Sequence, residues 1–144
     1  MSYTKILLHC VWGTKRREPV LTKEIRSLLI DHIKENASIK NIFIDTINGH
    51  TEHLHAILSL GARQNISEVM QLIKGESAFW INNKTTLLSR KFEWADEYFA
   101  VSISESQLDK VRAYIKNQEE HHKKQTFQQE YDEFITKYGF DKLG

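Results

Sequence analysis

The sequence predicts an α+β protein built on one four-stranded antiparallel sheet. Three observations support this fold class: four short apolar or alternating segments suited to strands, two segments of helical periodicity between them, and two further helical segments at the end. The predicted strands are residues 3–13, 39–48, 52–60 and 97–103. The predicted helices are residues 23–37, 66–82, 107–124 and 127–138. The order β-α-β-β-α-β is that of a ferredoxin-like fold, with helices on one face of the sheet.

The first half of the chain predicts a buried strand, a helix and a hairpin. Residues 3–13 are rich in Ile, Leu, Val and Trp, as expected of a strand buried on both faces. Thr22 is a suitable N-cap for the first helix, whose apolar residues recur on one side. Residues 39–48 alternate in polarity, and the turn NGHT at 48–51 joins them to residues 52–60 as a hairpin.

The second half predicts a helix, a strand and two more helices. Asn65 or Ser67 can cap the second helix, and the polar stretch that follows this helix predicts a loop before the fourth strand. Ser104 or Ser106 can cap the helix over 107–124. Gly139 is placed to end the last helix.

Length and composition restrict the class of protein. A chain of 144 residues fits one domain, 1–144, and a net charge of +1 excludes a globally basic nucleic-acid binder, so any nucleic-acid site must be a local patch. The single cysteine, Cys10, excludes an intramolecular disulfide and a cysteine-rich zinc module, and it suits a reducing, cytoplasmic location. No apolar run approaches the roughly 20 residues of a membrane-spanning helix, so no membrane association is expected.

The motif His53-Leu54-His55 is the first candidate for chemistry. On a strand, residues two apart point to the same face, so the two imidazoles lie side by side, opposite the apolar face that carries Leu54 and Leu58. Imidazoles paired in this way can chelate one divalent metal. A pair of solvated surface histidines fits the pattern equally well.

The second candidate is Tyr114 with Gln118, four residues apart and therefore on one helix face. A tyrosine at the border of the packed surface can be a nucleophile toward phosphorus when a metal polarises the phosphate. Taken alone, such a tyrosine more commonly packs its ring and exposes its hydroxyl to water.

The same helix ends in His121, His122 and two lysines. The negative end of the helix dipole explains cations there, and the group could also contact phosphate. Glu119 and Glu120 look like a solvated helix face.

Two more histidines and one basic cluster have weaker interpretations. His9 is expected to be a packed or hydrogen-bonded core residue, and His50 to be a solvated turn residue or a neighbour of the metal ligands. Lys15, Arg16 and Arg17 form the strongest local basic cluster, which suits a solvated loop or a phosphate contact.

Together these motifs resemble the single-tyrosine HUH transposases, which include small insertion-sequence transposases and REP-associated tyrosine transposases. The family's His-hydrophobic-His motif is matched by His53 and His55, and its Tyr-x-x-x-Gln motif by Tyr114 and Gln118. Further matching stretches are LIKGESA at 72–78, FEWADEYFAVSIS at 92–104 and VRAYIKNQEEHHKKQTFQQEY at 111–131. The resemblance runs from about Tyr3 to Gly139. The sequence departs from the family at Glu52, where an Asp is common before the first histidine.

The resemblance implies a ferredoxin-like fold and a metal-dependent strand-transfer reaction. By resemblance, His53, His55 and Gln118 bind Mg²⁺ or Mn²⁺, and Tyr114 attacks single-stranded DNA to form a 5′-phosphotyrosine and a free 3′-hydroxyl. The substrates implied are hairpin-bearing element ends. The assembly implied is a homodimer in which the tyrosine helix completes the partner's site. The residues expected to contact DNA are Lys15, Arg16, Arg17, Arg63 and Lys74.

Two other classes of function remain open from the sequence. One is a ferredoxin-like nucleic-acid-binding module without chemistry, in which the histidines are surface groups. The other is a metal-dependent hydrolytic nuclease, in which water attacks the phosphate and Tyr114 only packs. A covalent protein–DNA adduct distinguishes the transposase from both.

Overall fold

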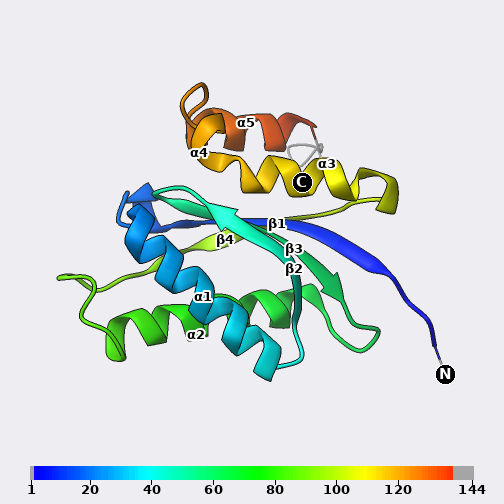
Figure 1. The fold of residues 1–144 in the computed structure, drawn as a ribbon, viewed down its shortest axis with the longest axis horizontal. Helices are drawn as coiled ribbons and strands as arrows, with labels where there is room; N and C mark the ends of the chain where they lie inside the picture. Colours follow the sequence, from blue (N-terminus) through cyan, green and yellow to red (C-terminus); the bar gives the residue numbers. More distant parts are fainter. Residues whose placement is uncertain (1, 138–144) are drawn as a thin grey trace.

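The computed structural model describes residues 2–137, which form a four-stranded antiparallel sheet with helices on both faces (Figure 1). The strands are β1 (Ile6–Thr14), β2 (Phe43–Gly49), β3 (His53–Leu60) and β4 (Trp94–Ser102). The helices are α1 (Lys23–Ile39), α2 (Ile66–Asn83), α3 (Leu108–Lys116), α4 (Gln118–His121) and α5 (Phe127–Lys137). Two 3₁₀ turns are η1 (Lys15–Arg17) and η2 (Glu105–Gln107). The expected helix stop at Gly139 lies outside the described residues.

The predicted element order and sheet are confirmed. The strand order is β2-β3-β1-β4, and every neighbouring pair is antiparallel, as in the ferredoxin-like arrangement. β1 is central beside β3, with Gly13 opposite His53 at one end and Ile6 opposite Leu60 at the other. This register places the turn that follows β1 at the end of the sheet where the histidine motif begins.

The main core lies between the sheet and the helices α1 and α2. β3 contributes Leu54 and Leu58, which are almost completely inaccessible, as alternation along a half-apolar strand requires. The helices contribute apolar residues spaced three and four apart, which gives each of them one buried face. The helical residues of this core include Leu29, Ile33, Val69 and Ile73.

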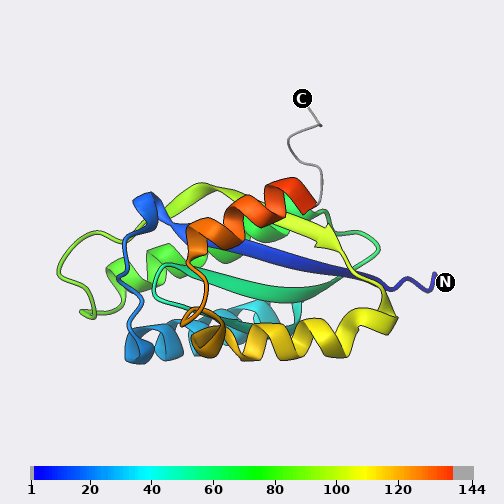
Figure 2. The same cartoon turned by 90° about the horizontal axis from the view of Figure 1, so that it is seen from above.

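The two helices of the ferredoxin-like unit lie on one face of the sheet, as predicted, but the opposite face is not open. In Figures 1 and 2, α1 and α2 lie on one face, while α3, α4 and α5 lie across the other. Arg112 of α3 donates two hydrogen bonds to Asp45 of β2, at 2.8 and 2.6 Å, and Tyr131 of α5 donates one to Glu97 of β4 at 3.1 Å. Both faces of the sheet are therefore buried at its centre.

The single helix expected over 107–124 is wrong. α3 ends at Lys116, and Asn117, with φ −102° and ψ 29°, separates it from the short α4. Neither Ser104 nor Ser106 caps it, because their hydroxyls bond to each other at 2.9 Å.

The two earlier caps are confirmed at Thr22 and at Asn65, whose side chains accept from the backbone N–H groups three residues on. The first two predicted strands begin later than expected, at Ile6 and Phe43, and β4 begins earlier, at Trp94, within the stretch expected to be a loop. Within residues 2–137, no helix is both long enough and apolar enough to cross a bilayer.

Candidate active site

The two histidines of the motif lie on the face of β3 opposite the main core, as predicted from strand alternation. Both are completely inaccessible to solvent, because the C-terminal helices cover them. The ring of Phe127 stacks on His53 with centroids 4.0 Å apart and planes within 5°. A solvated surface pair is therefore excluded.

The Nδ1 atom of each motif histidine has a hydrogen-bond partner. His53 Nδ1 lies 2.8 Å from Glu52 Oε1, so the carboxylate orients this ring and holds its proton on Nδ1. Burial alone would raise the pKa of Glu52, but the hydrogen bond and charge of His53 lower it. Glu52 thus reaches the first histidine despite the departure from the family's usual Asp.

His9 is buried, as expected, and belongs to the site. Its Nε2 lies 2.9 Å from His55 Nδ1. Burial, followed by the charge of His55, lowers the pKa of His9 to about 3. Burial lowers the pKa of His55 to about 4, although its hydrogen bond to Glu130 acts in the opposite direction. Both imidazoles are therefore neutral near pH 7, which is the state that binds metals.

Tyr114 and Gln118 meet the histidine pair from α3 and α4. Gln118 is inaccessible, and its Oε1 lies 3.1 Å from His53 Nε2. Its amide N–H₂ donates to the Tyr114 carbonyl at 3.2 Å, which fixes the orientation of the amide. The Tyr114 ring stands edge-on to His55 with centroids 5.6 Å apart. One chain thus brings the predicted nucleophile and the predicted ligands together.

Glu130 of α5 lies at the centre of this cluster and was not predicted. Its Oε1 lies 3.0 Å from His55 Nε2 and 3.5 Å from His53 Nε2. Its Oε2 accepts the hydrogen bond of the Tyr114 hydroxyl and lies 2.9 Å from His121 Nε2. An acidic residue on the apolar face of the tail helix, three residues after Phe127, was the available sequence signal.

The ionisation of the phenol and the carboxylate is strongly coupled. Burial raises the pKa of Tyr114 well above its ordinary value, and the charge and hydrogen bond of Glu130 raise it further. Burial alone would raise the pKa of Glu130, but the hydrogen bond and charge of His55, with the Tyr114 hydrogen bond, lower it well below its ordinary range. In this arrangement the proton stays on the phenol, and a carboxylate oxygen of Glu130 accepts its hydrogen bond.

The residues present fit a divalent metal ion. Ligand atoms of His53, His55 and Glu130 lie within 4.8 Å of one another, and Gln118 Oε1 adds a fourth donor beside His53. Neutral imidazole nitrogens combined with amide and carboxylate oxygens suit divalent cations such as Mn²⁺. The Nδ1 contacts of Glu52 and His9 are of the kind that orient metal-bound imidazoles.

The end of the third predicted helix differs from expectation. His121 and His122 do not form an open basic end, because their Nε2 atoms point toward Glu130 and His53, at 2.9 and 3.2 Å. Glu119 and Glu120 are exposed, as expected, and Glu119 also forms an ion pair at 2.9 Å with the buried Arg26 of α1. His50 is half-buried and stacks on His122 with centroids 5.0 Å apart.

The basic residues predicted to contact DNA are dispersed. Lys15 and Arg16 are exposed in η1, next to the end of β1 that pairs with His53. Arg17 stacks its guanidinium on Phe127 and Tyr131 of α5, 5.3 and 4.8 Å from the ring centroids. The remaining two are remote from the histidines: Arg63 follows the opposite end of β3, and Lys74 lies on α2, beyond the other face of the sheet, donating to the Asp96 carbonyl at 3.0 Å.

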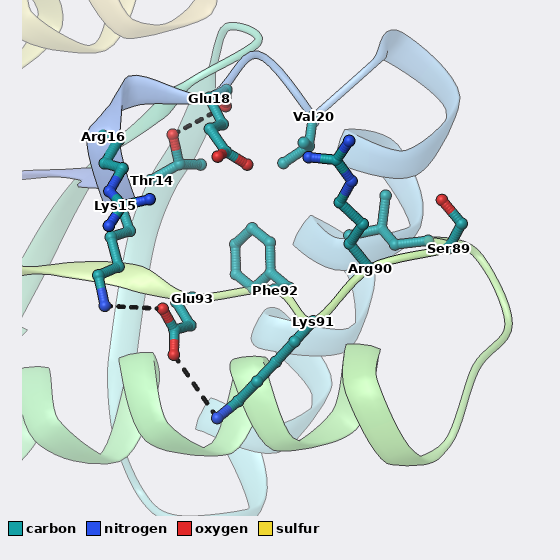
Figure 3. A pocket seen from close by; sticks show the side chains of 11 residues that line it. Thr14, Lys15, Arg16, Glu18, Val20, Ser89, Arg90, Lys91, Phe92 and Glu93 are labelled. Carbon is teal, nitrogen blue, oxygen red and sulfur yellow. Dashed lines mark hydrogen bonds and ion pairs between the residues drawn. The ribbon is translucent and has the colours of Figure 1, made fainter.

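A cavity of about 310 Å³ lies beside η1 (Figure 3). It lies between that turn and the segment before β4, which supplies Arg90 and Lys91. Glu93 forms ion pairs with Lys15 at 2.9 Å and Lys91 at 3.5 Å. Among residues 2–137, no carboxylate lies within ion-pair distance of Arg16 or Arg90, so these two guanidinium groups are available to an external anion.

Comparison with known proteins identifies relatives. The profile of the IS200-like transposase family matches residues 2–118. The ISDra2 transposase TnpA of Deinococcus radiodurans is 26% identical over 114 residues, which cover 76% of this chain and 81% of the relative.

Two solved structures share the fold. A crystal structure described as that of a transposase from Deinococcus radiodurans R1 superposes with a TM-score of 0.67 at 23% identity, covering 81% of this chain and 93% of that one. The structure of a REP-associated tyrosine transposase bound to a REP hairpin superposes with a TM-score of 0.59 at 18% identity, covering 81% of this chain and 68% of that one.

Proposed function

The chain belongs to the IS200-like transposase family, and from that membership we propose that it cleaves and rejoins single-stranded DNA through Tyr114. The observation that supports this most directly is the convergence of three elements on one carboxylate. Glu130 accepts the hydrogen bond of Tyr114 with one oxygen, and its other oxygen lies 3.0 Å from His55 Nε2. A single carboxylate group, that of Glu130, therefore lies between the phenol and His55.

The proposed ligands of a divalent cation are His53, His55 and Gln118. The cation supplies Lewis-acid stabilisation of the charge that develops on the phosphate oxygens. The side chains of His53, His55 and Gln118 are inaccessible, so the surrounding residues determine their positions before substrate arrives. We propose Mg²⁺ or Mn²⁺ as the cation.

In the proposed reaction, the Tyr114 oxygen attacks phosphorus as the phenol proton passes to Glu130. A new phosphorus–oxygen bond forms to tyrosine while the bond to the 3′ oxygen breaks, and that oxygen leaves as a hydroxyl after taking a proton from water. The product is a 5′-phosphotyrosine. In the reverse step a 3′-hydroxyl attacks this linkage, so strands are rejoined without an added energy source.

A phosphate-binding role for the residues around the 310 Å³ cavity follows from their charge. Arg16 and Arg90 are unpaired among the described residues and lie at the end of the sheet where His53 begins. Guanidinium groups bind phosphate oxygens through two parallel hydrogen bonds. We therefore propose that the DNA backbone approaches along this side, and that Arg63 and Lys74 contribute less.

The test is the covalent adduct itself. Incubation of the chain with single-stranded DNA and Mn²⁺ should give a protein–DNA band on a denaturing gel, and mass spectrometry should locate the nucleotide on the peptide that contains Tyr114. Tyr114→Phe should give no adduct. Tyr131→Phe is the matched control, because that phenol also donates to a carboxylate, but to Glu97 of β4 rather than to Glu130.

Two outcomes would contradict the proposal. Cleavage without any adduct would favour the hydrolytic nuclease, and DNA binding without cleavage would favour the non-catalytic module. Three related expectations stay predictions: a single domain over residues 1–144, a cytoplasmic location, and a homodimer that acts on hairpin-bearing ends.

A further inference from the structure

Three hydrogen-bond acceptors face one another beside the proposed nucleophile. Gln118 Oε1 lies 3.1 Å from His53 Nε2 and 3.1 Å from His122 Nε2, and the two imidazole nitrogens are 3.2 Å apart. The side chains are nearly inaccessible: His53 and Gln118 are completely buried, and the His122 imidazole is 3% exposed. Water therefore does not separate these atoms.

The other end of each side chain determines which atom faces the triplet. His53 Nδ1 donates to Glu52 Oε1 at 2.8 Å, and His122 Nδ1 donates to the Gln125 carbonyl at 2.8 Å. A neutral imidazole has only one N–H, so both Nε2 atoms present lone pairs. The Gln118 amide is oriented by its bond to the Tyr114 carbonyl, so it presents oxygen rather than nitrogen.

Three lone pairs at such separations repel one another unless a positive charge lies between them. Two neighbouring ligand atoms on one divalent ion are about 3 Å apart, since metal–ligand distances are about 2.1 Å. The observed separations match that value. The alternative is a second proton on one of the two imidazoles.

The spacing along the chain explains how His122 reaches this position. The His122 N–H donates to the Gln118 carbonyl at 2.9 Å, so the helical turn continues and the two side chains share one face. His121 points elsewhere, toward Tyr114 and Glu130. The His50 ring stacks on the His122 ring with centroids 5.0 Å apart, which helps to fix its orientation.

We propose that His122 is a ligand of the same metal ion, together with His53, His55 and Gln118, and that the resulting three-imidazole site binds Mn²⁺ in preference to Mg²⁺. Imidazole nitrogen suits transition metals, whereas Mg²⁺ prefers oxygen ligands and retains its water. The inference deepens the proposed function and rests on its metal site.

Isothermal titration of the metal-free chain with MnCl₂ and with MgCl₂, in the absence of DNA, tests this proposal. The variant is His122→Asn, and the control is His121→Asn, the adjacent histidine whose Nε2 faces Glu130 and Tyr114 rather than the three atoms of the triplet. Wild-type protein should bind Mn²⁺ more tightly than Mg²⁺. His122→Asn should bind Mn²⁺ about 100-fold more weakly and lose most of this preference, since even outer partners of metal ligands contribute 10–100-fold. His121→Asn should stay within about threefold of wild type.

A measurement on the wild-type chain tests the same assignment even if the His122→Asn variant does not fold. Electron spin-echo spectra of bound Mn²⁺ should require three directly coordinated imidazole nitrogens. Two nitrogens, or equal Mn²⁺ affinity in wild type and a folded His122→Asn, would overturn the assignment. Equal losses of Mn²⁺ affinity in the two variants would also overturn the assignment, because they would place the ion nearer His121. Absence of Mn²⁺ binding by the wild type would overturn it too, because a proton would then explain the short distances within the triplet. The covalent adduct assay is independent of these results, so the proposed function can stand when this inference fails.

Discussion

Replacing Glu130 with glutamine tests how Tyr114, the proposed nucleophile, loses its proton. The carboxylate is 2% exposed, and its oxygens contact Tyr114, His55 and His121. Glu130→Gln keeps the shape of the side chain and an acceptor for the phenol, but removes the negative charge and the ability to take a proton.

The structure sets the expected magnitudes. A hydrogen bond to a buried charged group contributes about 1.5–3 kcal/mol, and the amide can replace some of the three contacts. We expect a net loss of about 2 kcal/mol, which lowers the midpoint of thermal unfolding by about 5 °C in a chain of this size. General-base catalysis typically contributes about 10²–10⁴-fold, so adduct formation should slow by that factor.

The assay is the single-turnover rate of adduct formation with saturating Mn²⁺ and single-stranded DNA. Glu133→Gln is the matched control, because Glu133 lies on the same helix, is exposed, and bonds to Gln125 rather than to Tyr114. A rate in Glu130→Gln equal to that of the control would refute the role in proton transfer. A faster rate would show that the carboxylate obstructs the substrate.

Three further predictions concern stability and assembly. Burial lowers the pKa of His55 to about 4 and that of His9 to about 3, so the folded state does not accept protons that the unfolded chain takes up near pH 6.5. The free energy of unfolding, measured by urea in chelator, should therefore decrease by at least about 3 kcal/mol as pH falls from 6.5 to 4, and no decrease would contradict the buried neutral state. Mixing Tyr114→Phe with His55→Asn protein should restore no adduct, since the 5.6 Å ring separation lies within one chain, whereas restored adduct would demonstrate the trans completion that the resemblance implies. Gly49→Ala should destabilise the fold by about 3 kcal/mol, because the added Cβ would lie 2.1 Å from the His53 carbonyl oxygen. Gly75→Ala, in mid-helix with nothing within 4 Å of the added Cβ, should stabilise the fold by about 0.5–1 kcal/mol, so the two variants should shift the midpoint of thermal unfolding in opposite directions.

The sequence was sufficient for the sheet and the histidine motif because strand periodicity is local. A two-residue repeat determines which side chains of β3 face the core, so the pairing of His53 with His55 on the other face needed no tertiary information. The helix caps at Thr22 and Asn65 are local signals too.

The remaining features depend on contacts far apart in the sequence. No local pattern places Glu130 between His55 and Tyr114, because those residues come from β3 and α3. The break at Asn117 contains no Pro or Gly, and the helical periodicity continues across it, so the sequence does not reveal the break. The sequence likewise does not predict that helices cover the second face of the sheet, because an amphipathic helix has the same periodicity whether it packs on the sheet or elsewhere.

The order of the site residues along the chain has a consequence for biosynthesis. The histidine pair precedes Tyr114 by a long stretch of chain that includes α2 and β4. Translation adds about 5–20 residues per second, and N-terminal parts fold first. The sheet that carries the two motif histidines can therefore assemble on the ribosome some seconds before Tyr114 and Gln118 emerge, so a nascent chain passes through a stage in which the histidine pair is present but not yet covered by the C-terminal helices.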